Sequence, residues 1–141
     1  MKTAPIPAWL DKATLGLVED TIRLLIKRHG NILLAVILFG SVARHEERPL
    51  DGSYPSDVDL LAIFDTTDRL VKPYRDGIFA TIIDAYARHL DAPRDVNVLL
   101  ADRTMQTWDS MFLDNIAQDG ILLYVRGSLP AQLAVRLAPQ A

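Results

Sequence analysis

The segment LFGSVAR at residues 38–44, followed by SDVDLL at residues 56–61, decides the fold of this chain. Residues 32–39 form an apolar run of eight that stops at a Gly-Ser pair, a pattern typical of a strand covered on both faces. Residues 57–64 are apolar except for two aspartates at their start, and they predict a second strand. Between the two strands lies a polar stretch broken by prolines and glycine, for which we predict a helical turn and then a mobile loop.

The rest of the chain predicts helices and strands on both sides of this pair. The pattern indicates a helix over residues 15–29, a helix from about 78 to 89, a strand over 95–100, a helical segment capped by Asp102, a helix over 111–118 and a strand over 121–125. This order predicts an α/β or α+β fold, with a small sheet of about four strands flanked by helices.

Composition limits the class of protein. With 141 residues, half of them hydrophobic, we expect one domain with a core over about residues 14–125 and a tail over 126–141. The net charge of -3 argues against an open surface for nucleic acid, and the lack of cysteine excludes disulfides and thiolate zinc sites. The N-terminal segment has no apolar region of the kind found in secretory signals, and no apolar run approaches the roughly 20 residues of a membrane span. We therefore expect a cytoplasmic protein that binds no membrane.

The two aspartates form a candidate metal site. Side chains alternate along a strand, so Asp57 and Asp59 project from one face, roughly 6 to 7 Å apart. Two carboxylates so placed repel each other unless a cation compensates them, and Mg²⁺ or Mn²⁺ prefers such oxygen ligands. The alternative is an ordinary solvated strand entry.

The Gly-Ser turn is a candidate phosphate site. Gly40 would allow the backbone to approach a ligand closely, Ser41 adds a hydroxyl donor, and a short helix after the turn would present free backbone N–H groups. Arg44 could add a positive charge. The alternative interpretation is that the Gly-Ser pair is an ordinary turn and that Arg44 is an ordinary solvated residue.

Taken together, the two segments resemble the nucleotidyltransferase superfamily related to DNA polymerase β, particularly the minimal nucleotidyltransferases. The resemblance spans about residues 32–124, and residues 115–124 are similar to the usual end of the family's core. It implies a nucleotidyltransferase fold with a mixed sheet, in which Gly40, Ser41, Arg44 and Ser56 bind the triphosphate of ATP. Asp57 and Asp59 would hold the divalent metal, with a third carboxylate from a neighbouring strand.

Two features depart from the family pattern. The 15 residues between Ser41 and Asp57 exceed the spacing expected for the smallest members. On the third strand, Val96-Asn97-Val98 fits the family frame with asparagine where an aspartate is expected, and Asp95 lies two residues earlier on the same face. Either Asp95 is the third catalytic carboxylate after a shift in register, or Asn97 takes its place beside the nucleotide and the site has only two carboxylates.

Asparagine at that position predicts weaker metal binding and slower chemistry, because an amide carries no charge and accepts no proton. The resemblance implies a minimal nucleotidyltransferase antitoxin that transfers AMP to a small helical HEPN toxin as its partner. A second hypothesis is a catalytically silent antitoxin that neutralises its partner by occlusion alone. A third is a stand-alone adenylyltransferase acting on a small molecule.

Overall fold

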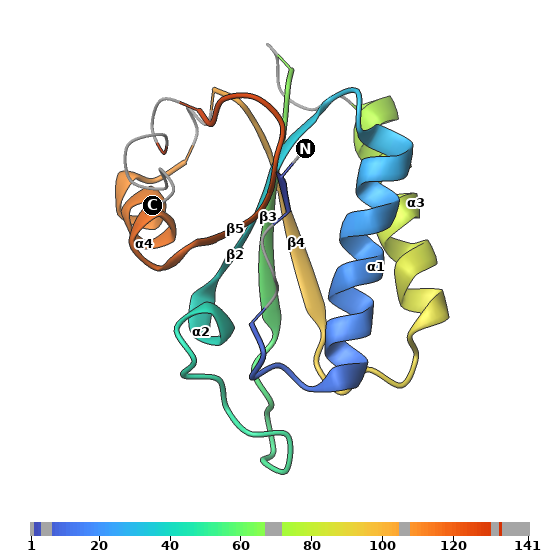
Figure 1. Ribbon diagram of the computed structural model, residues 1–141, viewed down its shortest axis with the longest axis vertical. Helices are drawn as coiled ribbons and strands as arrows, with labels where there is room; N and C mark the ends of the chain where they lie inside the picture. The colour runs from blue at the N-terminus through green and yellow to red at the C-terminus, as the bar shows by residue number, and fades with distance from the viewer. Residues whose placement is uncertain (1, 4–6, 67–71, 105–107, 131–132, 134–141) are drawn as a thin grey trace.

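The helices and strands follow the alternation of apolar segments along the chain. In a computed structural model, which describes residues 2–3, 7–66, 72–104, 108–130 and 133, the elements are β1 (Lys2–Thr3), α1 (Lys12–His29), β2 (Leu33–Phe39), α2 (Gly40–Ala43), β3 (Val58–Phe64), α3 (Lys72–Arg88), β4 (Val96–Asp102), α4 (Ser110–Asp119) and β5 (Ile121–Val125). The strands form one sheet in the order β1-β5-β2-β3-β4 (Figure 1).

The sheet is mixed. Strand β2 lies antiparallel to both β3 and β5, whereas β3 and β4 run parallel to each other. The predicted α/β fold, a small mixed sheet flanked by helices, is confirmed. The short strand β1, which pairs antiparallel with β5, adds a strand to the four that the sequence predicted.

Helices cover both faces of the sheet. Helices α1 and α3 lie side by side on one face, and α4 lies on the other (Figure 1). Two buried clusters result, because alternate residues of the two central strands point to opposite faces. Val36, Leu38, Leu60 and Ala62 belong to the cluster that includes the buried residues of α1 and α3, and Ala35, Ile37, Leu61 and Ile63 belong to the cluster of α4. Burial on both faces explains why these strands are almost free of polar residues.

Helix α1 agrees with the predicted helix and begins slightly earlier. Asp11 caps its N-terminus by accepting a hydrogen bond from the backbone N–H of Thr14 at 3.0 Å. Three basic residues in its last turn complement the helix dipole. None of the helices described by the structure has both the length and the hydrophobicity needed to cross a bilayer.

Helix α3 begins six residues before its predicted start near residue 78, at Lys72. Pro73 is tolerated because it lies in the first turn, where a backbone N–H has no partner within the helix. Gly77 lies inside the helix, where a β-carbon would stand 3.8 Å from the ring of His29. Both residue types usually disfavour helices, but neither Pro73 nor Gly77 interrupts α3.

Asp102 ends β4, and its Oδ1 accepts a hydrogen bond from the backbone N–H of Thr104 at 2.9 Å. The helical segment predicted after Asp102 would include residues 105–107, which lie outside the described residues. The helix predicted over residues 111–118 corresponds to α4, which is capped by Asp109 through a hydrogen bond from the N–H of Met111 at 2.7 Å. Of the predicted tail, only residues 126–130 and 133 lie within the described part of the chain.

Candidate functional site

The turn after β2 places its backbone against the start of β3. Gly40 has a φ of +80°, a left-handed conformation that glycine adopts without a steric penalty. Phe39 pairs with Asp59 across the two strands, so Gly40 lies beside that aspartate. A β-carbon on Gly40 would stand 2.5 Å from Oδ2 of Asp59. Glycine is thus required at position 40 by its backbone conformation and by the neighbouring carboxylate.

Ser41 lies in the first turn of the short helix α2. Its backbone oxygen accepts a hydrogen bond from the N–H of Glu46 at 2.8 Å, and within the described residues its hydroxyl has no hydrogen-bond partner. Because α2 has only four residues, it adds little macrodipole. An anion at this turn would therefore be bound by individual N–H and O–H donors.

Strand register brings Asp57, Asp59 and Asn97 together. Asp59 is half-buried on β3 and pairs with Asn97 on the parallel strand β4, while Asp57 is exposed and directly precedes β3. The side-chain amide of Asn97 donates hydrogen bonds to Oδ2 of Asp57 at 2.9 Å and to Oδ1 of Asp59 at 3.5 Å. One neutral amide therefore links the two carboxylates.

The carboxyl group of Asp59 is electrostatically unfavourable in its charged form. Burial raises its pKa, the hydrogen bond from Asn97 lowers it, and the charge of Asp57 raises it again. The positive charge of Arg44 lowers it further, but the net direction is upward. A bound cation would remove this penalty, because it would favour the ionised form of both aspartates.

The donor set fits a divalent ion held by two carboxylates. The described part of the chain contains no group of three or more histidine or acidic side chains that could hold a metal. Mg²⁺ is commonly bound by one or two carboxylates together with water and substrate phosphates, so two aspartates beside a phosphate turn suffice. Asn97 would have to turn its amide oxygen toward the ion to contribute.

Asp95 and Ser56 take no part in the hydrogen bonds that link Asp57, Asp59 and Asn97. Asp95 precedes β4, its side chain is exposed, and its backbone oxygen accepts from the N–H of Val58 at 2.8 Å. Asn97 therefore takes the position opposite Asp59. Ser56 is buried, and its hydroxyl accepts a hydrogen bond from the backbone N–H of Arg48 at 2.7 Å. This hydrogen bond closes the loop between Arg48 and Ser56.

Arg44 lies near the carboxylates but is engaged elsewhere. Its guanidinium is 3.4 Å from carboxylate oxygens of both Glu46 and Asp119. Both ion pairs are exposed, and such pairs contribute little free energy, so they would not prevent Arg44 from turning to a phosphate.

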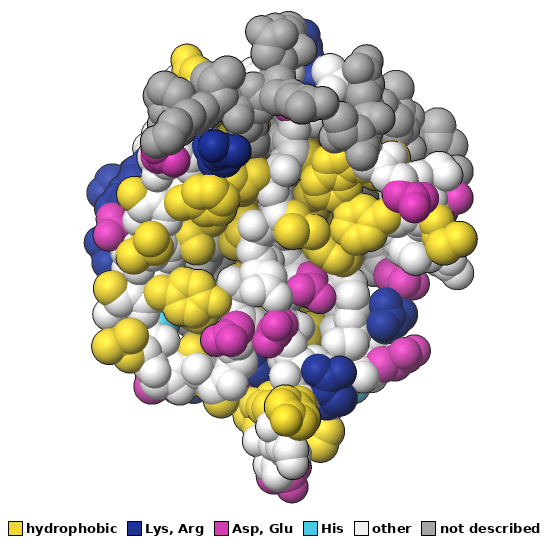
Figure 2. All heavy atoms as spheres, turned by 180° about the vertical axis from the view of Figure 1, so that it is seen from behind, with side chains coloured by type: hydrophobic (Ala, Val, Ile, Leu, Met, Phe, Trp, Pro, Cys, Tyr) yellow, Lys and Arg dark blue, Asp and Glu magenta, His cyan; other side chains and the backbone are white. Residues whose placement is uncertain are grey.

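A hollow of about 530 Å³ adjoins Asp59 and Asn97. The end of β2 contributes Phe39 to its lining. Strand β4, at the edge of the sheet, contributes residues from both of its faces, and α3 contributes three more. These residues are Val96, Val98 and Leu99 of β4 and Phe79, Ile82 and Tyr86 of α3. Figure 2 shows hydrophobic side chains gathered on this back surface of the molecule, with acidic side chains between them.

Sequence reasoning missed Phe79 and Leu99. Both are large apolar residues that remain about 40% exposed. For Phe79 the only signal was its place on α3 outside the apolar stripe, and for Leu99 it was an apolar residue on β4; neither shows what the side chain faces. Tyr86 donates a hydrogen bond to the backbone oxygen of Val96 at 2.8 Å and so fixes the start of β4 beside Asn97.

The loop over residues 45–56 stands beside the site and is largely exposed. Ser56 and Arg48 form its neck, because they are joined by two hydrogen bonds. Trp9 packs against its base: its ring stacks on His45 with centroids 4.5 Å apart, and its Nε1 donates to the backbone oxygen of Val42 at 2.8 Å. Tyr54, at 79% exposure, lies near the tip.

No protein-family model and no curated protein sequence matches the chain. Its fold is similar to three solved structures of toxin–antitoxin complexes. One contains AMP-PNP (22% identity over 77% of this chain and 73% of that chain, TM-score 0.46), and one is the MntA-HepT complex (20% identity, 80% and 73%, TM-score 0.44). The third is a tri-AMPylated HEPN toxin with its MNT antitoxin from Shewanella oneidensis (19% identity, 78% and 73%, TM-score 0.43). These values describe a distant resemblance of chain path.

Proposed function

We propose that this chain is a minimal nucleotidyltransferase that uses Mg²⁺ or Mn²⁺ to transfer AMP from ATP to a hydroxyl group of a partner protein. One observation supports this above the others: the Gly40 turn lies directly against the Asp59 carboxylate. Donors suited to phosphate and oxygens suited to a metal therefore meet where β2 ends and β3 begins. Neither the turn nor the pair of aspartates would indicate a site by itself, but their contact supports one shared site.

Each group has a defined task in the proposed reaction. The backbone N–H groups of the turn and the hydroxyl of Ser41 bind the triphosphate, and Arg44 turns from its exposed ion pairs toward the same phosphates. Asp57 and Asp59 would hold the ion, and a bound ion would supply charge neutralisation for the triphosphate. The acceptor hydroxyl attacks the α-phosphorus in line, and pyrophosphate is released. Asn97 keeps the two carboxylates in register. As an amide it accepts no proton, so the reaction is slower than with a third carboxylate.

The surface around the site favours a protein as acceptor. The hollow beside Asp59 is lined mainly by apolar and aromatic side chains, and the adjacent loop exposes Leu50 and Tyr54. Such surfaces are typical of protein contacts, whereas a net charge of -3 repels a polyanion. The family resemblance implies a helical toxin of the HEPN kind as that partner, with this chain as the antitoxin.

A second candidate function is a silent antitoxin that binds the partner without modifying it. The observation that favours it is the amide of Asn97, which lies opposite Asp59 and bonds to both aspartates. The two functions share a surface and differ only in chemistry.

In the deciding experiment, the protein is incubated with ATP labelled at the α-phosphate, MgCl₂ and the product of the gene next to its own. We expect label on the partner, loss of label with the Asp57→Asn, Asp59→Asn variant, and no change with Asp91→Asn, which replaces an exposed aspartate outside the site. A complex that neutralises the partner without label supports the silent function. Label on RNA or on an aminoglycoside, without any partner, contradicts both.

A further inference from the structure

A second hollow lies at the opposite end of the sheet from the carboxylates. It has a volume of about 610 Å³ and forms where β2 begins and where β3, β4 and β5 end. The seven-residue strand β3 separates it from Asp59, which corresponds to about 20 Å. The hollow is therefore distinct from the proposed nucleotide site.

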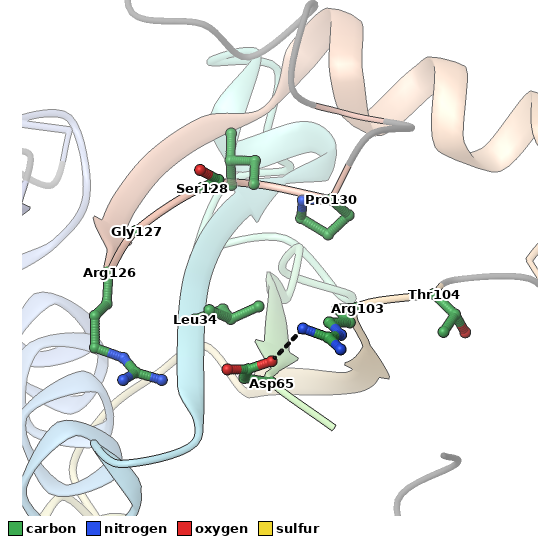
Figure 3. A pocket seen from close by; sticks show the side chains of 9 residues that line it. Leu34, Asp65, Arg103, Thr104, Arg126, Gly127, Ser128 and Pro130 are labelled. Carbon is green, nitrogen blue, oxygen red and sulfur yellow. Dashed lines mark hydrogen bonds and ion pairs between the residues drawn. The ribbon is translucent and has the colours of Figure 1, made fainter. Parts of the chain in front are cut away.

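Two arginines and one carboxylate line this hollow. Arg103 bonds to Oδ1 of Asp65 at 3.0 Å. Arg126 donates to two backbone carbonyls, from Nε to Leu33 and from Nη2 to Asn31, both at 3.1 Å. Within the residues that the structure describes, no carboxylate pairs with Arg126. Figure 3 shows the two arginines on either side of Asp65. The hollow thus carries an excess positive charge on a side chain that is already held in place.

The backbone beside Arg126 repeats the feature found at the first site. Gly127 has a φ of +78°, close to the +80° of Gly40, and a serine follows it in both turns. A β-carbon on Gly127 would meet no atom within 4 Å, so this turn borders open space. In the part of the chain described, the N–H groups of Gly127 and Ser128 make no hydrogen bond to the backbone. These N–H groups and the Ser128 hydroxyl are suited to bind an anion.

Three of the four remaining lining residues are apolar, and the fourth, Thr104, donates its hydroxyl to Oδ1 of Asp102. Leu34, Leu129 and Pro130 complete the wall, and the volume is larger than an inorganic anion needs. A ligand with a charged group and a small organic part would use both kinds of surface.

We propose that this hollow binds a small organic phosphate ester. The phosphate group lies between Arg103, Arg126 and the Gly127-Ser128 turn, and the organic part packs on Leu34, Leu129 and Pro130. Guanidinium groups and backbone N–H groups are common phosphate donors, because they match its charge and several acceptor oxygens. Asp65 competes with the ligand for Arg103.

Because Asp65 competes with the ligand for Arg103, substitutions of these two residues should change the ligand affinity in opposite directions. Arg103→Gln removes a donor and should weaken binding by about fivefold, whereas Asp65→Asn frees Arg103 and removes a repulsive charge, so it should tighten binding by about fivefold. The exposed pair of Arg28 and Asp84 on α1 and α3 provides matched controls. Arg28→Gln and Asp84→Asn should leave the affinity unchanged.

The measurement is a titration of ¹⁵N-labelled protein with glycerol 3-phosphate, inorganic phosphate or glycerol at constant ionic strength. We expect saturable shifts of the Gly127 and Ser128 amides, with the ester binding more tightly than phosphate and glycerol not binding. Resolved amides also separate this site from Gly40 and Ser41. Shifts that chloride reproduces, or an Asp65→Asn variant that binds no more tightly than the parent, overturn the proposal. Equal affinities for the ester and for phosphate overturn the assignment of the apolar wall.

Discussion

The backbone of Gly40 lies against the carboxylate of Asp59, with only 2.5 Å between Oδ2 and the position that a β-carbon of residue 40 would occupy. The phosphate turn and the metal ligands therefore cannot change independently. A side chain at position 40 must displace either the turn or Asp59.

Gly40→Ala should consequently abolish ATP binding and lower stability more than Gly127→Ala does. Both glycines have the same left-handed conformation, which costs alanine about 1–2 kcal/mol, but only at Gly40 does the new methyl group meet a carboxylate. The free energies of unfolding in urea of the two variants separate the cost of the backbone conformation, which both share, from the cost of the contact with Asp59, which only Gly40→Ala has. Equal losses of stability would show that the contact with Asp59 does not matter.

Asp59→Asn should stabilise the metal-free protein. Burial and the charge of Asp57 raise the pKa of Asp59, so its ionised form destabilises the fold at neutral pH and the penalty disappears as the pH falls through that pKa. We expect Tm at pH 7 without metal to rise by about 1–3 °C. Added Mg²⁺ should raise the Tm of the parent and leave that of the variant unchanged. Calorimetry with both proteins checks this reversal, and a variant less stable than the metal-free parent contradicts it.

Asn97→Asp should tighten Mg²⁺ binding by about tenfold and raise any transfer rate, since it adds a carboxylate opposite Asp59. The same change should lower Tm without metal, because a third negative charge joins the pair. Asp95→Asn is the matched test of the other candidate for the third ligand. If transfer collapses in Asp95→Asn and is unchanged in Asn97→Asp, then Asp95 is the working third ligand.

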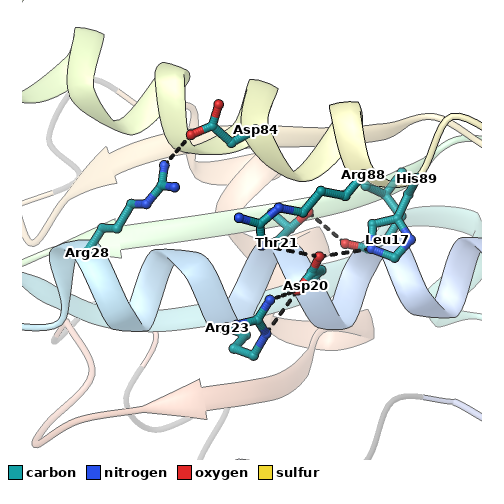
Figure 4. Close-up of polar contacts among 8 residues, drawn as sticks. All are labelled: Leu17, Asp20, Thr21, Arg23, Arg28, Asp84, Arg88 and His89. Atoms are coloured by element: carbon teal, nitrogen blue, oxygen red, sulfur yellow. Dashed lines mark hydrogen bonds and ion pairs between the residues drawn. The ribbon is translucent and has the colours of Figure 1, made fainter.

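Because of Asp20, the free energy of unfolding should depend on pH in the acidic range. It joins α1 to α3 through His89 at 2.9 Å and also pairs with Arg23 and Arg88 (Figure 4). The hydrogen bond from Arg23 lowers its pKa, burial opposes this, and His89 lowers it further. Its contribution is therefore present above its unfolded pKa of about 3.9 and is lost as the pH falls through the lower folded value.

Urea unfolding between pH 3 and pH 7 should show the parent more stable than Asp20→Asn at neutral pH, with a difference that shrinks in acid. Asp84→Asn, at the exposed pair with Arg28, is the control and should change stability little. A difference between parent and Asp20→Asn that stays constant down to pH 3 would contradict the assignment.

Removal of residues 49–55 should separate nucleotide binding from partner recognition. Arg48 and Ser56 close the neck of this loop, so a short Gly-Gly link preserves the entry to β3 while removing the exposed Leu50 and Tyr54. We expect ATP binding to survive and partner binding or modification to fall about tenfold or more. A double substitution of Leu50 and Tyr54 by serine tests the same surface without shortening the chain. Parental partner affinity in both variants would exclude the loop as a docking surface.

The sequence revealed the site better than it revealed the surroundings of the site. The two central strands were predictable because burial on both faces leaves a continuous apolar run, and their ends carry Gly40 and Asp59. Local patterns could not show that β4 lies parallel to β3, and only that pairing brings Asn97 to the carboxylates. Local patterns also could not show the contact of Ser56: its hydroxyl accepts a hydrogen bond from the backbone N–H of Arg48, eight residues earlier, where the two ends of the loop meet.

The boundaries of helices depended on context in the same way. Pro73 and Gly77 are typical helix breakers, yet one lies in the first turn of α3 and the other faces His29. Asp109 caps α4, and β4 extends to Asp102, two residues beyond the strand end predicted from the sequence.

Trp9 gives the molecule a built-in optical reporter. Its indole N–H donates to the backbone oxygen of Val42, next to Ser41, and its ring stacks on His45. Any ligand that moves the turn should change the intensity or wavelength of this emission, and Trp108→Phe would leave Trp9 as the sole tryptophan. Occupancy by ATP could then be followed in real time on unlabelled protein, before any partner or product is known.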